Sequence, residues 1–137
     1  MTGMLCTRGV ILLLMAFAGA VGGSNVVFAD ASMDRVFKEL EPEERAHQAC
    51  NLRGIDAVRR GTHLKGVDRI TTTMQSPAVF KNNVVSSNAG AVRAGHHWYM
   101  LKFTCAVTAD QMKATSFDFQ LGAEIPEAKW EDFGLWK

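Results

Sequence analysis

The stretch Gly90-Ala-Val-Arg-Ala-Gly-His-His-Trp-Tyr-Met-Leu-Lys-Phe-Thr-Cys-Ala-Val107 predicts the central strand of a small antiparallel sheet, around which the rest of the chain is organised. Successive side chains of a strand point to opposite faces of the sheet. Alternate positions from Tyr99 to Val107 form an apolar face that includes Cys105. The other face is mixed and is expected to be partly exposed. The sequence therefore predicts a sheet with one buried face.

The following strand, 113–121, is expected to pair with this one as a hairpin. A four-residue loop would pair Val107 with Met112 and would mix polar and apolar residues on each face. A five-residue loop from Thr108 to Met112 instead sets apolar residues against each other inside and opposite charges against each other outside, which stabilises a sheet. The predicted pairs are Val107 with Lys113, Phe103 with Phe117, Leu101 with Phe119, Tyr99 with Leu121, Lys102 with Asp118 and Thr104 with Ser116.

Helical periodicity and turn residues place the other elements. Ser32 is predicted to cap a short helix that ends at Leu40. Glu41-Pro42 starts a second helix, because proline suits the first helical position. The remaining predictions are a break near Asn51 to Gly54, a helix end at Arg59-Arg60-Gly61, strands at 70–74 and 79–85 (the second open to interruption at Asn82-Asn83), a loop at 86–90, and a closing helix from Ile125-Pro126-Glu127 to Gly134. Together they predict an α+β fold: N-terminal helices packed on a small antiparallel sheet, closed by a short C-terminal helix.

Residues 1–29 are predicted to form a cleavable signal peptide, which leaves 30–137 as a single small domain. One charge, Arg8, precedes an unbroken apolar run of 12 residues, whereas a membrane-spanning helix needs about 20. Val27-Phe28-Ala29 carries small residues at the positions that favour a cut after Ala29. A retained N-terminal anchor is the alternative. The expected location is the periplasm or the outside of the cell, with no membrane span after cleavage.

Export gives the two cysteines of the domain a specific meaning. Cys50 and Cys105 form an even pair, and such a pair in an oxidising compartment predicts a disulfide. The bridge would close a loop of roughly 55 residues and stabilise the fold by about 4 kcal/mol in the chain-entropy model. The competing interpretations are a catalytic thiol and a metal thiolate, which the wide spacing disfavours. The third cysteine, Cys6, would leave with the signal.

The charge balance and the missing motifs exclude several functions. Of the 15 Lys and Arg residues only Arg8 precedes Asp30, so the domain has 14 basic and 14 acidic residues and is formally neutral. This neutrality argues against a nucleic-acid binder and against a polybasic membrane-surface protein. No Gly-x-Ser-x-Gly, His-Glu-x-x-His or glycine-rich phosphate loop occurs, so no catalytic residue, cofactor or metal is predicted. The expected partner is an unknown protein or envelope component.

The candidate binding surface is the outward face of the central strand, with His96, Trp98 and Met100 on it and Arg93 nearby. Imidazole and thioether groups on one face would suit monovalent copper. His96 and His97 point to opposite faces of a strand, however, so both cannot bind one ion without a bulge. The other interpretations of this face are a ligand groove lined by Trp98 and packing against the C-terminal segment.

The C-terminal segment carries three large aromatic side chains, Trp130, Phe133 and Trp136. Apolar groups of this size rarely remain in water without a role. They are expected to pack against the sheet, and the alternative is a patch that binds a partner.

Several short motifs occur together in a recognisable order. They are Leu40-Glu41-Pro42-Glu43-Glu44-Arg45, Gln48-Ala49-Cys50, Trp98-Tyr99, Leu101-Lys102-Phe103-Thr104-Cys105, Thr115-Ser116-Phe117, Gly122-Ala123-Glu124-Ile125-Pro126, Trp130 and Gly134-Leu135-Trp136. On these residues the chain resembles a bacterial domain-of-unknown-function family, number 930, over most of Leu40 to Trp136. The resemblance implies an exported α+β domain with a paired cysteine, and it brings no activity and no catalytic residue.

The function expected from the sequence is therefore a non-enzymatic, exported module that binds a partner or associates with the cell envelope. The alternatives are a small envelope-processing hydrolase and a copper-binding carrier.

Overall fold

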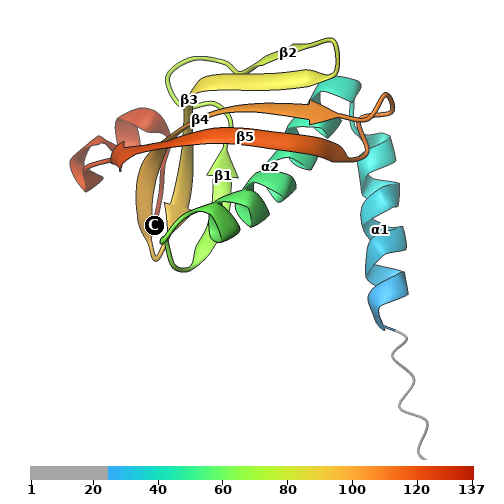
Figure 1. The fold of residues 1–137 in the computed structure, drawn as a ribbon, viewed down its shortest axis with the longest axis horizontal. Coiled ribbons are helices and arrows are strands. Elements are labelled where there is room, and N and C mark those ends of the chain that lie inside the picture. Colours follow the sequence, from blue (N-terminus) through green and yellow to red (C-terminus); the bar gives the residue numbers. More distant parts are fainter. Residues whose placement is uncertain (1–24) are drawn as a thin grey trace, which may run out of the picture.

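The computed structural model describes residues 25–137, with side chains from residue 31 onward, and it has the predicted α+β architecture (Figure 1). In chain order the elements are α1 Asn25–Glu39, α2 Pro42–Gly61, β1 Val67–Thr71, β2 Val79–Lys81, β3 Val84–Ala94, β4 His97–Val107, β5 Ala114–Glu124, and the 3-10 turns η1 Glu127–Lys129 and η2 Glu131–Phe133. The predicted signal peptide lies outside the described residues as far as residue 24, and the backbone of 25–29 belongs to α1.

One antiparallel sheet forms the centre of the fold, with strand order β1-β3-β4-β5. β3 is long enough to pair with β2 along its first residues and with β1 along its last. α2 packs on one face of the sheet, the C-terminal turns lie at one end, and α1 leaves the body at the opposite end (Figure 1). None of the described helices is both long enough and apolar enough to cross a bilayer.

The buried core between α2 and the sheet contains the disulfide. Alternate residues of β4 from Leu101 to Val107 point into this core, as predicted. Among them Cys105 is bonded to Cys50 of α2, with Cα atoms 5.9 Å apart and both side chains fully buried. The predicted bridge is confirmed, and it ties the helix layer to a central strand of the sheet.

Arg45 connects both helices to the loop between β4 and β5. Its guanidinium donates to the main-chain carbonyls of Phe37 and Leu40, each over 2.9 Å, at the end of α1. It also donates to the carbonyl of Asp110 over 2.9 Å. The last turn of α1 is therefore held against the body, although the rest of the helix projects from it.

The stretch predicted as one central strand is two strands, β3 and β4, joined by a tight turn. Gly95 and His96 have φ angles of 55° and 66°, which suit a two-residue hairpin turn. The turn was missed because a positive φ is uncommon for residues other than glycine. Residues 86–90, predicted as a loop, belong to β3, which carries a bulge between Ser87 and Gly90.

The two strands before β4 also differ from their predicted bounds. Asn82 and Asn83 form a turn with φ angles of 51° and 59°, so the interruption predicted in 79–85 is confirmed and separates β2 from β3. β1 lies three residues earlier than the predicted strand at 70–74. Its two core residues are Val67 and Ile70, and a bulge between them accounts for their spacing.

The β4–β5 hairpin has a different register from the predicted one. Phe103 is opposite Phe119 rather than Phe117, a shift of two positions. One position comes from a longer loop, since Val107 pairs with Ala114, and the other comes from a bulge beside this pair. The neighbouring pairs are Leu101 with Leu121, Lys102 with Gln120, Thr104 with Asp118, Cys105 with Phe117 and Ala106 with Ser116. A shift of two keeps each side chain on its face, so the inward face of β5 is confirmed and the predicted pairs are wrong.

α2 begins at Pro42 and ends at Gly61 as predicted, but the break expected near Gly54 is absent from this helix of 20 residues. Gly54 is buried and faces the sheet. A β-carbon there would lie 2.6 Å from Cδ1 of Ile70 and 2.6 Å from Cζ of Phe117. The glycine is therefore a point of close approach between helix and sheet rather than a helix end.

Replacing Gly54 with alanine is expected to lower the free energy of unfolding by about 1–2 kcal/mol. Overpacking costs about 1–3 kcal/mol, and the gain in helix propensity returns at most about 1 kcal/mol. Urea denaturation followed by tryptophan fluorescence measures the change. Gly61→Ala is the matched control and should change less, because its nearest contact would be 3.1 Å from Cζ of Phe119. A Gly54→Ala variant as stable as the wild type would contradict the close approach.

The predictions for both ends of the described chain differ from the structure. α1 begins at Asn25, so Ser32 lies inside the helix and does not cap it. The predicted closing helix is instead two 3-10 turns. Gly134, with a φ of 66°, ends the second turn at the predicted position. The segment is too short for a regular helix because the chain reverses there, with the backbone N–H of Leu135 donating to the carbonyl of Trp130 over 2.7 Å.

Candidate functional site

The outer face of the sheet is covered at one end, and Trp98 of β4 lies fully buried beneath that cover. The buried residues packed with it are Ala91, Ile125, Trp130 and Leu135, and Met74, Met100 and Phe133 lie half-buried around them. This second, smaller core forms because the outward alternation of β4 places an indole where the C-terminal turns fold back. The predicted packing of the C-terminal aromatics on the sheet is confirmed for Trp130.

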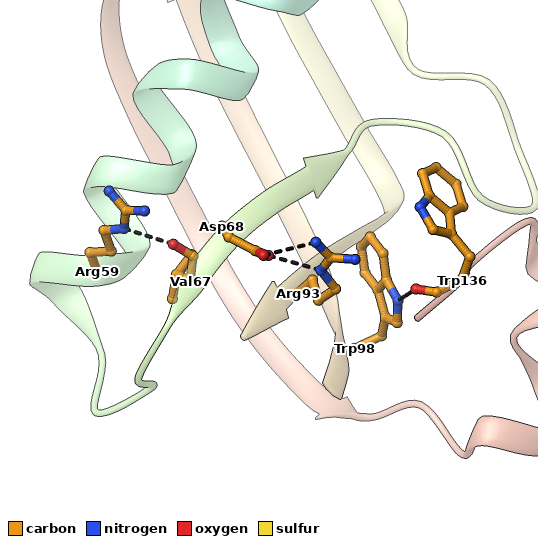
Figure 2. A network of polar contacts seen from close by, with 6 residues as sticks. All are labelled: Arg59, Val67, Asp68, Arg93, Trp98 and Trp136. Carbon is orange, nitrogen blue, oxygen red and sulfur yellow. Dashed lines mark hydrogen bonds and ion pairs between the residues drawn. The ribbon is translucent and has the colours of Figure 1, made fainter. Parts of the chain in front are cut away.

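Hydrogen bonds hold the C-terminal segment in place. The indole Nε1 of Trp98 donates to the main-chain carbonyl of Trp136 over 2.9 Å (Figure 2). The indole Nε1 of Trp130 donates to the carbonyl of Ile125 over 2.8 Å, and the backbone N–H of Ile125 donates to the carbonyl of Trp98 over 2.7 Å. We call this set of contacts the C-terminal lock. It fixes the backbone from which the Trp136 side chain projects.

The side chain of Trp136 remains open to solvent although its backbone is held. Its ring is edge-on to that of Trp98, with centroids 6.2 Å apart and planes at 61°. The guanidinium of Arg69 lies over the Trp136 ring, 5.1 Å from its centroid. The residue is nevertheless 52% exposed. Trp136 is thus a large aromatic group with two neighbouring side chains, Trp98 and Arg69, and a free surface.

Arg93 lies next to the buried ring of Trp98. Its Nε and Nη2 donate to the two carboxylate oxygens of Asp68 over 2.9 and 2.8 Å, and its guanidinium lies 5.8 Å from the Trp98 ring centroid. Figure 2 shows the guanidinium between the carboxylate and the indole. The hydrogen bonds from Arg93 hold the pKa of Asp68 below its ordinary value. The stabilisation from this pair is therefore present above the ordinary pKa and is lost as the pH falls through the lowered one.

We call these residues, Asp68, Arg69, Arg93 and Trp136 with Trp98 beneath them, the Arg–Trp surface. β1 supplies the first two, and the bond from Arg59 of α2 to the carbonyl of Val67, 2.7 Å long, anchors the start of that strand (Figure 2). Asp68 neutralises Arg93, whereas Arg69 forms no ion pair with any residue that the structure describes. The surface therefore offers an exposed indole next to an uncompensated positive charge.

The structure brings together three of the four residues predicted for the binding surface, Arg93, Trp98 and Met100. Trp98 is buried rather than outward, because the C-terminal segment covers it. Met100 is half-buried beside it. His96 lies in the exposed β3–β4 turn, so it does not share a strand face with the other two as predicted. Among residues 31–137, no group of three or more His, Cys, Asp or Glu side chains is arranged to hold a metal ion.

A hollow of about 390 Å³ at the same end of the sheet is lined by His96, His97, Glu124, Glu127, Trp130 and Lys137. His97 Nδ1 lies 2.6 Å from Glu124 Oε1, and these side chains are 57% and 51% exposed. A histidine oriented by a carboxylate is one part of a catalytic arrangement that also needs a nucleophile. The lining residues include no serine, threonine or cysteine.

The first half of α2 lines another hollow, of about 420 Å³, which the sequence patterns did not indicate. Its lining residues are Glu41, Glu43, Glu44, His47, Gln48, Asn51 and Thr72. His47 Nδ1 is 3.1 Å from Thr72 Oγ1, whereas His47 Nε2 and Asn51 Oδ1 are buried without a hydrogen-bond partner among the described residues. Asn51 follows His47 by four positions, and this helical spacing is the signal that could have placed them on one face.

Comparison with known proteins finds one matching family model. A family model with the description Domain of Unknown Function (DUF930) matches residues 37–135, which include α2, all five strands and both bridged cysteines. No curated protein and no solved structure matches the chain.

Proposed function

The chain belongs to the DUF930 family, whose description assigns no activity, and we propose that it is an exported module that binds a partner through the Arg–Trp surface. One observation carries this proposal: Trp136 is 52% exposed while the bond from Trp98 holds its backbone. A side chain that is positioned in advance loses less conformational entropy on binding. Tryptophan and arginine are also the residues most enriched at the energetically dominant positions of interfaces.

The chemistry of the surface suggests what the partner presents. The free face of Trp136 favours a flat or apolar group, and the uncompensated charge of Arg69 favours a carboxylate or phosphate beside it. Arg93 is already paired with Asp68 and contributes to positioning rather than to net charge. The partner that fits best is one with an apolar group and an acidic group side by side.

Export is the second part of the proposal. The bridge between Cys50 and Cys105 is consistent with an oxidising compartment. The apolar run near the N-terminus has the length of a signal-peptide core. Both observations support a module that works in the periplasm or outside the cell.

Replacing Trp136 with alanine is expected to weaken partner binding by about 30-fold, the cost of about 2 kcal/mol that marks a dominant interface residue. The full chain serves as bait for an envelope extract of its source cells, the captured component is identified by mass spectrometry, and its affinity is then titrated. The Trp98 bond goes to the main-chain carbonyl of Trp136, so the variant keeps the donor and the acceptor of this bond of the C-terminal lock.

Leu52→Ala is the matched control, because Leu52 of α2 is also 52% exposed and lies outside the Arg–Trp surface. This variant should bind the partner like the wild type. An identified partner that binds Trp136→Ala as tightly as the wild type would contradict the proposed surface.

The hydrolase alternative is favoured by one observation, the contact between His97 and Glu124 beside a hollow. Its weakness is the lack of a serine, threonine or cysteine nucleophile among the lining residues. Ester or amide hydrolysis that His97→Ala abolishes and His63→Ala retains would favour an enzyme over a binding module. The copper-carrier alternative has less support, because His96 lies in a turn and Met100 under the C-terminal segment.

A further inference from the structure

The outer edge of β5 is an unpaired sheet edge, and it lies outside the Arg–Trp surface. β5 is the last strand in the order β1-β3-β4-β5, so within residues 25–137 no strand pairs with its outer side. Bulges near its two ends leave the segment from Ser116 to Leu121 in regular register with β4. An edge of this kind presents a row of unpaired backbone N–H and C=O groups to another strand.

Apart from the bulges near its two ends, this edge lacks the features that protect most sheet edges. Besides bulges, the usual protection is proline, lysine and inward-pointing charge. The segment 116–121 contains none of these, and its one charge is Asp118 on the outer face. The inward row is incompletely covered by α2: Phe117 and Phe119 are half-buried, and Leu121 is 37% exposed. A second strand along this edge would cover that row.

We propose that β5 pairs with β5 of a second copy of this chain, in antiparallel orientation about a two-fold axis through Phe119. The two sheets then form one continuous sheet. In this register Phe119 faces its own copy, and Phe117 faces Leu121 of the second copy on the inner face. On the outer face Asp118 faces Gln120 of the second copy, where an amide can donate to a carboxylate. No like charges oppose each other, which is the complementarity that favours a second copy.

The neighbouring two-fold registers are less favourable. An axis through Asp118 would place two carboxylates opposite each other, which is destabilising. An axis through Gln120 would leave Phe117 opposite Ala123 and Asp118 opposite Gly122, so both the aromatic contact and the amide–carboxylate contact would be lost. The sequence of β5 therefore selects the register centred on Phe119.

Substitutions at Gln120 test this register, because they change the stability of the dimer and the stability of the single chain in opposite directions. Gln120→Glu would face Asp118 of the second copy twice per dimer and is expected to raise the dimer dissociation constant about tenfold. Gln120→Lys would form two opposite-charge pairs and lower it by a similar factor. Within one chain Gln120 is opposite Lys102, so Gln120→Glu favours the monomer fold and Gln120→Lys disfavours it. A loss of folded protein would instead weaken the dimer of Gln120→Lys, which is the opposite order.

Sedimentation velocity of the full chain with its disulfide formed, from about 1 µM to about 1 mM, measures the association. The expected result is a concentration-dependent monomer–dimer equilibrium, weakened by Gln120→Glu and strengthened by Gln120→Lys. Gln75→Glu, the same change in an exposed loop, should leave it unchanged. A monomer at every concentration, equal shifts in both Gln120 variants, or the same weakening in Gln75→Glu would each overturn the proposal. None of these outcomes bears on partner binding at Trp136.

Discussion

Replacing both Cys50 and Cys105 with alanine is expected to lower the free energy of unfolding by about 4 kcal/mol. The bridge joins residues with a sequence separation of 55 and so restricts the conformations of the unfolded chain. In the chain-entropy model, losing the bridge restores this conformational entropy to the unfolded state. Domains of this size are stable by about 5–15 kcal/mol, so the bridge supplies a large share of the total. Both side chains are fully buried, and the substitution therefore also leaves a small cavity. Urea denaturation followed by tryptophan fluorescence measures the difference.

The reduced wild-type chain is the control that separates the bridge from the cavity. It keeps both sulfur atoms in the core but loses the bond, so it should show most of the 4 kcal/mol, to within about 1 kcal/mol. A reduced chain within about 1 kcal/mol of the oxidised one would mean that packing, and not the bridge, holds α2 on the sheet.

Replacing Trp98 with alanine is expected to lower the free energy of unfolding by about 3–5 kcal/mol, the usual cost of deleting a fully buried aromatic side chain. The loss has a local signature as well. Without the indole donor and its packing, the C-terminal lock opens, and the backbone N–H of Leu135, which donates to Trp130, should exchange with solvent much faster. Denaturation gives the first effect, and amide hydrogen exchange gives the second.

Trp98→Phe distinguishes packing from hydrogen bonding. It keeps most of the apolar volume but loses the donor to the Trp136 carbonyl, so its hydrogen-bond loss costs about 1 kcal/mol. If Trp98→Ala leaves exchange at Leu135 unchanged, the C-terminal segment is held by something other than Trp98, and the account of the lock is wrong.

The helix α2 and the faces of the sheet could be predicted because local chemistry decides them. Pro42 suits a first helical position, and the alternation from Leu101 to Val107 places Cys105 inward, where it meets Cys50. The register of β5 could not be predicted in the same way. A bulge adds one residue to a strand, and no particular residue type marks its position in the sequence. Each added residue shifts the pairing of all residues that follow it. The turn at His96 was missed for a similar reason, because histidine does not by itself mark a positive φ.

The candidate site was predicted only in part. Trp98 and Arg93 were singled out from their positions on one strand and near it, and the structure places them in contact. Asp68 and Arg69 were not predicted to belong to the site. They lie in it only because β1 pairs with β3, which places Arg69 opposite Arg93. The sequence also did not show that the C-terminal aromatic residues differ in burial. Trp130 is buried and Trp136 is exposed because the chain reverses at Gly134, between the two. Long-range pairing and chain reversal, rather than residue type, decided these positions.

The central claim is that the C-terminal lock presents an exposed but rigid Trp136 side chain. Nitrogen-15 relaxation of the three indole N–H groups tests it most directly. We predict an order parameter near 0.85 for Trp136, as for Trp98 and Trp130, together with fast solvent exchange at Trp136 and slow exchange at the other two, whose indoles are hydrogen-bonded. An order parameter below about 0.6 at Trp136 would show a freely moving side chain and would contradict the account.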